Sequence, residues 1–177
     1  NEVTKLSTDA QEIVSGTFRS FEATLTRPGD AISSYYGLVI DGIFQTQAEV
    51  DAHADQGGKA VGRWRFQDIN GDGVINDGDR TILGTPHPDL IYGLTTNFGY
   101  KNWDLSLFLQ GIQGNEVFNT NKLFADLFQF QGNRTKKVIR QSWGYPGVDN
   151  STAELPQINQ NAPVIEKDAN SYYVEDG

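Results

Sequence analysis

The sequence predicts a mainly β fold with many turns and short helices. The 177 residues include 19 glycines and 11% aromatic side chains, and the mean hydropathy is -0.48, which favours strands and turns over a helical bundle. The clearest pattern is a pair of alternating apolar and polar runs in residues 90–112, separated by a two-residue turn. No stretch approaches the roughly 18 apolar residues that a membrane helix needs. The sequence does not exclude a membrane-spanning strand, which is shorter.

Residues 1–89 are expected to form a loop-rich region. Residues 1–34 are polar, with a turn at residues 27–30, and residues 35–46 predict one bent strand that glycines interrupt. The next segment, residues 47–53, suits one or two turns of helix.

Residues 68–79 place oxygen atoms at the spacing of a calcium loop. In such a loop, positions 1, 3, 5, 9 and 12 supply ligands, position 6 is glycine and position 7 offers its carbonyl. The candidate metal ligands are Asp68, Asn70, Asp72, Val74, Asn76 and Asp79. Gly73 stands at the turn position and Ile75 at the position of an aliphatic anchor, so a structural calcium ion of modest affinity is expected. The alternative is a plain turn rich in Asn, Asp and Gly.

Residues 90–112 predict a hairpin that turns at Lys101 and Asn102. Pairing across this turn gathers apolar side chains on one face and leaves the other face mostly polar. The apolar face comprises Leu94, Thr96, Phe98, Tyr100, Trp103, Leu105, Leu107 and Leu109. This pattern suits a lipid-facing barrel hairpin with Tyr100 and Trp103 in an aromatic girdle, and a hairpin packed inside a soluble sandwich has the same period.

Residues 113–177 are expected to form one long loop with short helices. Four apolar residues have helical spacing, namely Leu123, Phe124, Leu127 and Phe128. Asn133 is expected to cap a second short helix through residue 140, whose basic side chains form a solvated face. Residues 143–177 show no sustained period and are rich in turn-forming residues.

Composition excludes several function classes. A net charge of -9 argues against binding nucleic acid through general electrostatics. The absence of cysteine excludes disulfides, thiolate catalysis and cysteine metal sites. The chain has no Met and shows no signal peptide, so we expect it to be a piece of a longer protein.

No enzyme activity is expected. His53 and His87 lie in unrelated polar and Pro-rich contexts, and no glycine-flanked serine motif accompanies them. Asp and Glu are plentiful, but no pair of carboxylates stands out as a glycosidase pair.

An ordered series of motifs resembles one protein family. The motifs include SYYG at 34–37, DGIFQ at 41–45, FQDINGDG at 66–73, YKNWDLS at 100–106 and SYYVEDG at 171–177. Together they resemble the C-terminal part of a SusC/RagA-type TonB-dependent outer-membrane transporter.

The resemblance implies a segment of a large plugged transmembrane β-barrel, of the class with about 22 strands. It implies the outer membrane of Bacteroidetes as location and import of a glycan or peptide as function. The implied partners are a SusD-like surface lipoprotein, which lids the barrel, and TonB, which acts through a part of the parent protein outside this chain. In this topology residues 1–89 and 113–177 are extracellular loops and residues 90–112 are a barrel hairpin with a periplasmic turn, so most of the chain faces the cell surface.

Three aromatic residues, Trp64, Trp143 and Tyr145, are candidates for stacking on the sugar rings of a nutrient. Packing between loops or against the lid is the alternative for them. The alternative to the transporter as a whole is a secreted, soluble β module that binds calcium and carbohydrate.

Overall fold

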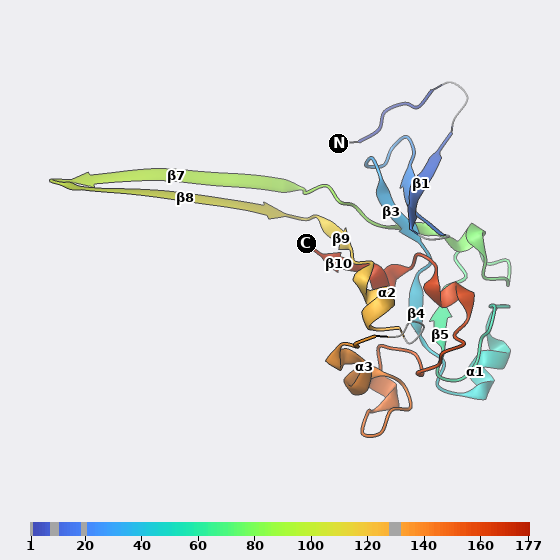
Figure 1. The fold of residues 1–177 in the computed structure, drawn as a ribbon. Helices are drawn as coiled ribbons and strands as arrows, with labels where there is room; N and C mark the ends of the chain where they lie inside the picture. Colours follow the sequence, from blue (N-terminus) through green and yellow to red (C-terminus); the bar gives the residue numbers. More distant parts are fainter. Residues whose placement is uncertain (1, 8–10, 19–20, 128–131) are drawn as a thin grey trace.

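A long two-stranded hairpin projects from a body made of small sheets and short helices (Figure 1). The computed structural model describes residues 2–7, 11–18, 21–127 and 132–177. The hairpin extends well beyond the body, and the last strand of the chain lies close to its base.

The hairpin consists of β7 (Leu90–Tyr100) and β8 (Trp103–Gln113), which pair antiparallel over their whole length. Tyr100 lies opposite Trp103 and Leu94 lies opposite Leu109. The turn is tight because Lys101 adopts a left-handed backbone conformation, with φ of 53°. The predicted hairpin and its register are therefore confirmed.

The N-terminal region forms a four-stranded antiparallel sheet. Its strands, in spatial order, are β1 (Ile13–Phe18), β2 (Phe21–Thr26), β3 (Ser34–Gly37) and β6 (Thr81–Gly84). The turn predicted at residues 27–30 is present, because the Asp30 N–H donates to the Arg27 carbonyl at 3.3 Å. The sequence did not predict β1 and β2, because residues 1–34 are polar and show no alternating pattern.

The single bent strand expected over residues 35–46 is wrong, because β3 ends at Gly37 and β4 (Ile40–Ile43) belongs to another sheet, in which it pairs with β5 (Trp64–Phe66). The C-terminal region causes this division. The Leu38 N–H donates to the Ala169 carbonyl at 2.9 Å, and the Ser171 N–H donates to the Leu38 carbonyl at 2.9 Å. Gly37 permits the approach, since a Cβ there would collide with the Ala169 backbone.

In the part of the chain that the structure describes, three short helices pack on the body. They are α1 (Gln47–Ala52), α2 (Asn121–Ala125) and α3 (Lys136–Gln141). The helix predicted at residues 47–53 is confirmed, and Thr46 caps it by accepting the Glu49 N–H. The expected Asn133 cap is wrong: α3 begins after Thr135, whose hydroxyl donates to Asp126 and makes no capping bond. Of the four residues with helical spacing, Phe128 lies outside the described residues.

No helix in the described part of the chain is long and apolar enough to cross a membrane.

The tail returns to the base of the hairpin. Beyond β8, β9 (Glu116–Phe118) pairs antiparallel with β10 (Val174–Asp176), and the Gly177 N–H donates to the Asn115 carbonyl at 2.9 Å. The described residues also contain short 3-10 helices. They are η1 (Asp77–Asp79), η2 (Asn150–Thr152), η3 (Val164–Lys167) and η4 (Ser171–Tyr173). The segment 113–177, expected from the sequence to be one long loop, therefore begins and ends side by side at the base of the hairpin.

The core of the body draws on segments that are far apart in sequence. Its most enclosed large side chains, among the described residues, are Phe66, Trp64, Leu123, Leu155 and Tyr173, each at most 1% exposed. Because α2, β5 and the C-terminal turns contribute to the same cluster, the extracellular loops predicted from the sequence form one packed unit.

Candidate functional site

The hairpin exposes an unusual amount of apolar surface. Leu94, Phe98, Trp103 and Leu109 lie on one face and are 58%, 59%, 79% and 61% exposed. The opposite face carries Asn97, Asp104 and Ser106 over the half nearer the turn, and Ile91, Phe108 and Ile112 nearer the body. One face is thus apolar except for Thr96 and Gln113, and the other changes from mostly polar to mostly apolar along the strands.

Such a hairpin is unsuited to water. In the described structure β7 and β8 form a sheet of two strands, so each has one edge without a strand neighbour. Isolated two-stranded hairpins are marginally stable at best, and apolar patches of this length are rare on soluble monomers. The hairpin therefore requires neighbouring strands along its edges and an apolar medium against one face.

Tyr92 shows how the apolar face is filled where a side chain is lacking. Tyr92 pairs with Gly111, and the Tyr92 ring lies over this glycine so closely that a Cβ at position 111 would collide with it. The aromatic ring replaces the missing side chain and covers the bare backbone.

The second candidate site is the loop of residues 68–79. Hydrogen bonds from backbone N–H groups to the loop's own Asp and Asn side chains hold its shape. Asp68 accepts the N–H groups of Gly71 at 2.7 Å and Gly73 at 2.9 Å. Asn70 accepts the Asp72 N–H at 2.9 Å, and Asp72 accepts the Val74 N–H at 2.8 Å. Of the six predicted ligands, Asn70, Asp72, Val74 and Asn76 are exposed, Asp68 is partly buried and Asp79 is buried.

Two predicted features of this loop are confirmed. Gly73 has φ of 83°, the left-handed conformation that the turn position demands. Ile75 is 6% exposed and belongs to the core, and its N–H donates to the Asp55 carbonyl at 2.9 Å. The loop is thereby anchored to the body at its eighth position.

Asp79 closes the loop from inside. Its carboxylate is buried and accepts the N–H groups of Ile69 at 2.9 Å, Asn70 at 3.4 Å and Asn76 at 2.9 Å. Burial alone would raise the pKa of Asp79, but the N–H groups of Asn76, Asn70 and Ile69 outweigh burial and hold this pKa below its ordinary value. These bonds occupy three of the about four lone-pair positions of a carboxylate.

The donor set of the loop is all oxygen, which suits calcium. In the described residues, however, no three His, Cys, Asp or Glu side chains converge on a shared metal position. A cation in this loop would therefore depend on Asn70, Asn76 and the Val74 carbonyl as well as on Asp68 and Asp72.

The three candidate sugar-stacking residues have different surroundings. Trp64 is 1% exposed, and its indole N–H donates to the Glu154 carbonyl at 3.0 Å, so its ring packs in the core. Trp143 is partly buried, donates from its indole to the Gln45 side chain at 3.0 Å and covers Gly62. Tyr145 is also partly buried, and its N–H donates to the Ser142 carbonyl. The structure does not gather them on one surface.

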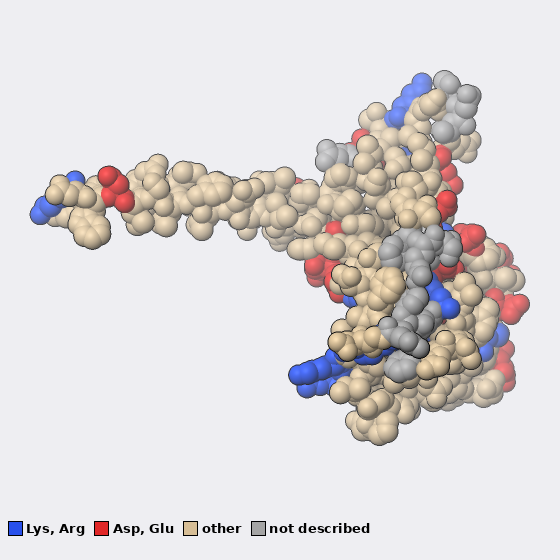
Figure 2. Space-filling view, in the orientation of Figure 1, with Lys and Arg blue, Asp and Glu red and all other residues tan. Residues whose placement is uncertain are grey.

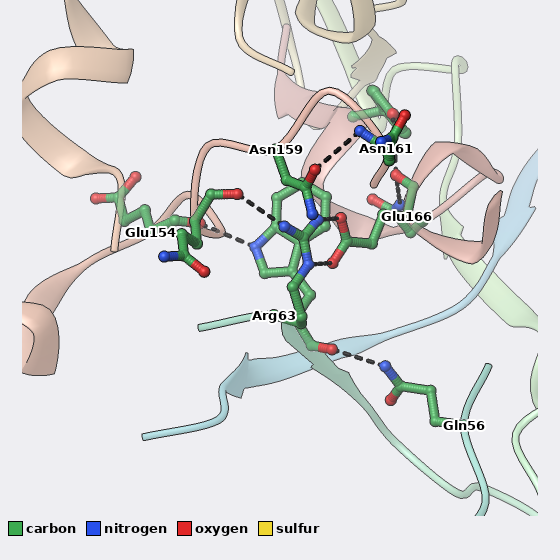
Figure 3. Close-up of polar contacts among 10 residues, drawn as sticks. Gln56, Arg63, Glu154, Asn159, Asn161 and Glu166 are labelled. Carbon is green, nitrogen blue, oxygen red and sulfur yellow. Dashed lines mark hydrogen bonds and ion pairs between the residues drawn. The ribbon is translucent and has the colours of Figure 1, made fainter. Parts of the chain in front are cut away.

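A buried ion pair is the polar feature that the sequence did not signal. Two nitrogens of Arg63 donate to the two carboxylate oxygens of Glu166, and the third, Nη1, donates to the Gln157 carbonyl at 2.7 Å (Figure 3). Burial raises the pKa of Glu166, and Arg63 opposes that shift. Because the two residues are 103 positions apart, nothing in the local sequence pairs their side chains.

The hydrogen bonds around this pair join the loops. Gln56 donates to the Trp64 carbonyl at 2.8 Å, and within the loop that precedes η3 the Asn161 N–H donates to the Asn159 side chain at 2.9 Å (Figure 3). The pair thus fixes the segment before β5 to η3 and to the loop that precedes it.

Comparison with known proteins gives a consistent set of relatives. The chain is 35% identical over 150 residues to TonB-dependent receptor P26 of Formosa agariphila and 32% identical over 168 residues to TonB-dependent receptor P3 of the same organism. These matches cover 84% and 92% of the chain but 14% and 15% of the relatives. A stretch of 64 residues is 39% identical to TonB-dependent receptor SusC of Bacteroides thetaiotaomicron, covering 36% of the chain and 6% of that receptor. No protein-family model matches the chain.

Proposed function

Because the chain belongs to the SusC-type TonB-dependent receptors, we propose that it forms part of an outer-membrane importer, to which it contributes one barrel hairpin and the surface loops beside it. The observation that carries this proposal is the projecting hairpin with one almost entirely apolar and exposed face. The chain spans about one seventh of its relatives, so import is proposed for the whole receptor and not for this segment alone.

The length of the hairpin supports a membrane crossing. Each strand has 11 residues. At about 3.3 Å per residue a strand of this length extends roughly 36 Å, and a tilt of about 40° reduces its span to roughly 28 Å. This matches the hydrocarbon thickness of about 30 Å.

The two faces then have different environments. Leu94, Phe98, Leu105 and Leu107 face lipid, and Tyr100 with Trp103 lies at the periplasmic interface beside the Lys101 turn. The opposite face, with Asn97 and Ser106, faces the barrel interior. The packed body lies outside the cell, above the strands, because long loops of such barrels are extracellular.

The partners follow from the family. We propose a SusD-like surface lipoprotein as the lid over the body and TonB as the source of energy on the periplasmic side. The nutrient is a glycan or a peptide, and Trp143 and Tyr145 are better placed than Trp64 to contact it, because Trp64 is buried.

We further propose that the loop of residues 68–79 binds a structural calcium ion. Its oxygen donors, its spacing and the anchoring of Ile75 support this assignment. The ion would neutralise Asp68 and Asp72 and fix the shape of one extracellular turn.

The membrane placement is tested by arginine substitution on the two faces of the hairpin in the full-length receptor. Leu107→Arg lies in the lipid-facing row and should cost about 2–4 kcal/mol, which lowers the folded fraction in the outer membrane. Ser106→Arg, its neighbour on the other face, is the matched control and should assemble normally. The measurement is the heat-modifiable mobility of the barrel, and equal assembly of both variants would contradict the proposal.

A further inference from the structure

The basic residues of this acidic chain are unevenly distributed. Five of the 14 Lys and Arg residues fall between positions 122 and 140, together with one acidic residue, Asp126. Two of them have carboxylate partners that neutralise their charge. Lys122 pairs with Glu175 at 2.7 Å, and Lys137 pairs with Glu154 at 2.9 Å. Of the other three basic residues, Arg134 precedes α3, and Lys136 and Arg140 belong to it.

The helix α3 has one buried and one exposed side. Val138 is 2% exposed and packs into the core. Lys136, Ile139 and Arg140 are all exposed and lie on the opposite side of the helix, because they are separated by three and four positions. Within the described residues, no carboxylate lies within ion-pair distance of Lys136 or Arg140.

The exposed side of α3 points in a defined direction. Figure 2 shows basic side chains that project from the region of α3 on the side of the body from which the hairpin extends. If β7 and β8 cross the bilayer, their body ends lie at its outer interface, and this side of the body faces the membrane surface. The apolar side chain of Ile139 is 50% exposed and lies on the same side of the helix as the two charges.

We propose that the α3 face formed by Lys136, Ile139 and Arg140 rests on the anionic headgroup layer of the outer leaflet. This inference relies on the membrane placement proposed above. Lys136 and Arg140 contact headgroup phosphates, and Ile139 reaches the boundary with the acyl chains. The contact positions the packed loops relative to the membrane beside the barrel.

Charge complementarity favours a lipid surface as the occupant. The chain as a whole carries a net charge of -9, so anionic headgroups would repel it. A basic face turned toward the membrane offsets this repulsion where the body approaches the headgroups. The mixture of two long cationic side chains with one apolar residue is typical of surfaces that lie at a membrane interface.

The contact can be tested by photo-crosslinking in the full-length receptor. Benzoylphenylalanine replaces Ile139, and the receptor is reconstituted in nanodiscs of phosphatidylcholine, either alone or with about one third phosphatidylglycerol. Mass spectrometry then quantifies lipid adducts at position 139. We expect adducts that are several-fold more abundant in the anionic discs.

Charge reversal provides the specific readout. The double variant Lys136→Glu with Arg140→Glu should lower the adduct yield in anionic discs to the level of neutral discs. Lys5→Glu, which reverses an exposed charge elsewhere, should leave the yield unchanged. A yield that does not depend on lipid charge or on Lys136 and Arg140, or a crosslink to protein alone, would overturn the inference.

A second crosslinker position separates this inference from the proposed function. Benzoylphenylalanine at Leu107, on the lipid-facing row, should give lipid adducts in both kinds of disc. Lipid adducts at position 107 but none at position 139 would refute the docking of α3 and leave the barrel placement intact. No adducts at either position would refute both.

Discussion

Asp79 is the residue on which the 68–79 loop depends most. Its carboxylate accepts three backbone N–H groups from both ends of the loop, and no other side chain of the loop is as deeply buried. The twelfth position, predicted from the sequence as a calcium ligand, therefore has a structural task even without a metal ion.

This task makes the loop sensitive to acid. The pKa of Asp79 is lower in the folded loop than its ordinary value of 3.8, so the ionised form is bound more tightly in the folded state. The stabilisation of the folded loop by ionised Asp79 is fully present above about pH 4, and it is lost as the pH falls through the lower pKa of the folded state. Hydrogen exchange of the Ile69 and Asn76 amides should show protection that decreases in this range.

Asp79→Asn should remove the pH dependence and leave weak protection at every pH, because the neutral amide is a poorer acceptor; the expected loss of local stability is about 2 kcal/mol. Asp77→Asn, at an exposed carboxylate two residues away, serves as the control. Unchanged protection in Asp79→Asn would contradict the assigned role.

Calcium binding is tested at the first position of the loop. In the full-length receptor, titration calorimetry should detect binding with a dissociation constant of about 0.1–1 mM, the range of extracellular calcium modules. Asp68→Ala should abolish the heat, and Asp77→Ala should retain it, since Asp77 is outside the ligand set. The absence of binding in the unmodified receptor would reduce the loop to a turn.

The hairpin depends on the match between Tyr92 and Gly111. Gly111→Ala should displace the Tyr92 ring and destabilise the barrel by about 1–2 kcal/mol, measured as a shift of the urea unfolding midpoint. Combining Gly111→Ala with Tyr92→Ala should cost less than the sum of the two single changes, because the collision disappears with the ring. Strict additivity would show that the ring and the glycine are independent.

Elements differ in how far the sequence alone predicts them. The register of β7 and β8 follows from an alternation of period two around a short turn, so every piece of information is local. The pairing of β9 with β10 joins residues almost 60 positions apart, and neither three-residue strand has a period of its own. Likewise, β3 and β4 separate because residues 169–171 pair with Leu38, which no pattern within residues 35–46 records.

Sites show the same division. Gly73 and Ile75 have the roles predicted from their loop positions, because the loop builds itself from neighbouring residues. The burial of Trp64 and the pair of Arg63 with Glu166 depend on packing between distant segments, so the sequence suggested a ligand contact for Trp64 and gave no signal for the ion pair.

On the scale of the whole molecule, one chain combines two kinds of environment. The body buries its apolar side chains in a shared core, as a water-exposed unit does, while the hairpin turns its apolar side chains outward. The two parts meet where β8 runs into β9 and β10 returns. This arrangement is what the proposed placement requires, with packed loops outside the cell and strands in contact with lipid.

The most direct test of this account is an accessibility scan along the hairpin in the full-length receptor in its membrane. Single cysteines at Asn97, Phe98, Leu105 and Ser106 would be treated with a water-soluble maleimide; the chain itself contains no other cysteine. In the proposed placement, positions 97 and 106 face the barrel interior, and positions 98 and 105, on the other face of the hairpin, face lipid. We therefore predict labelling at positions 97 and 106 and protection at positions 98 and 105. Labelling at all four positions, or the opposite alternation, would contradict the placement of the hairpin in the membrane.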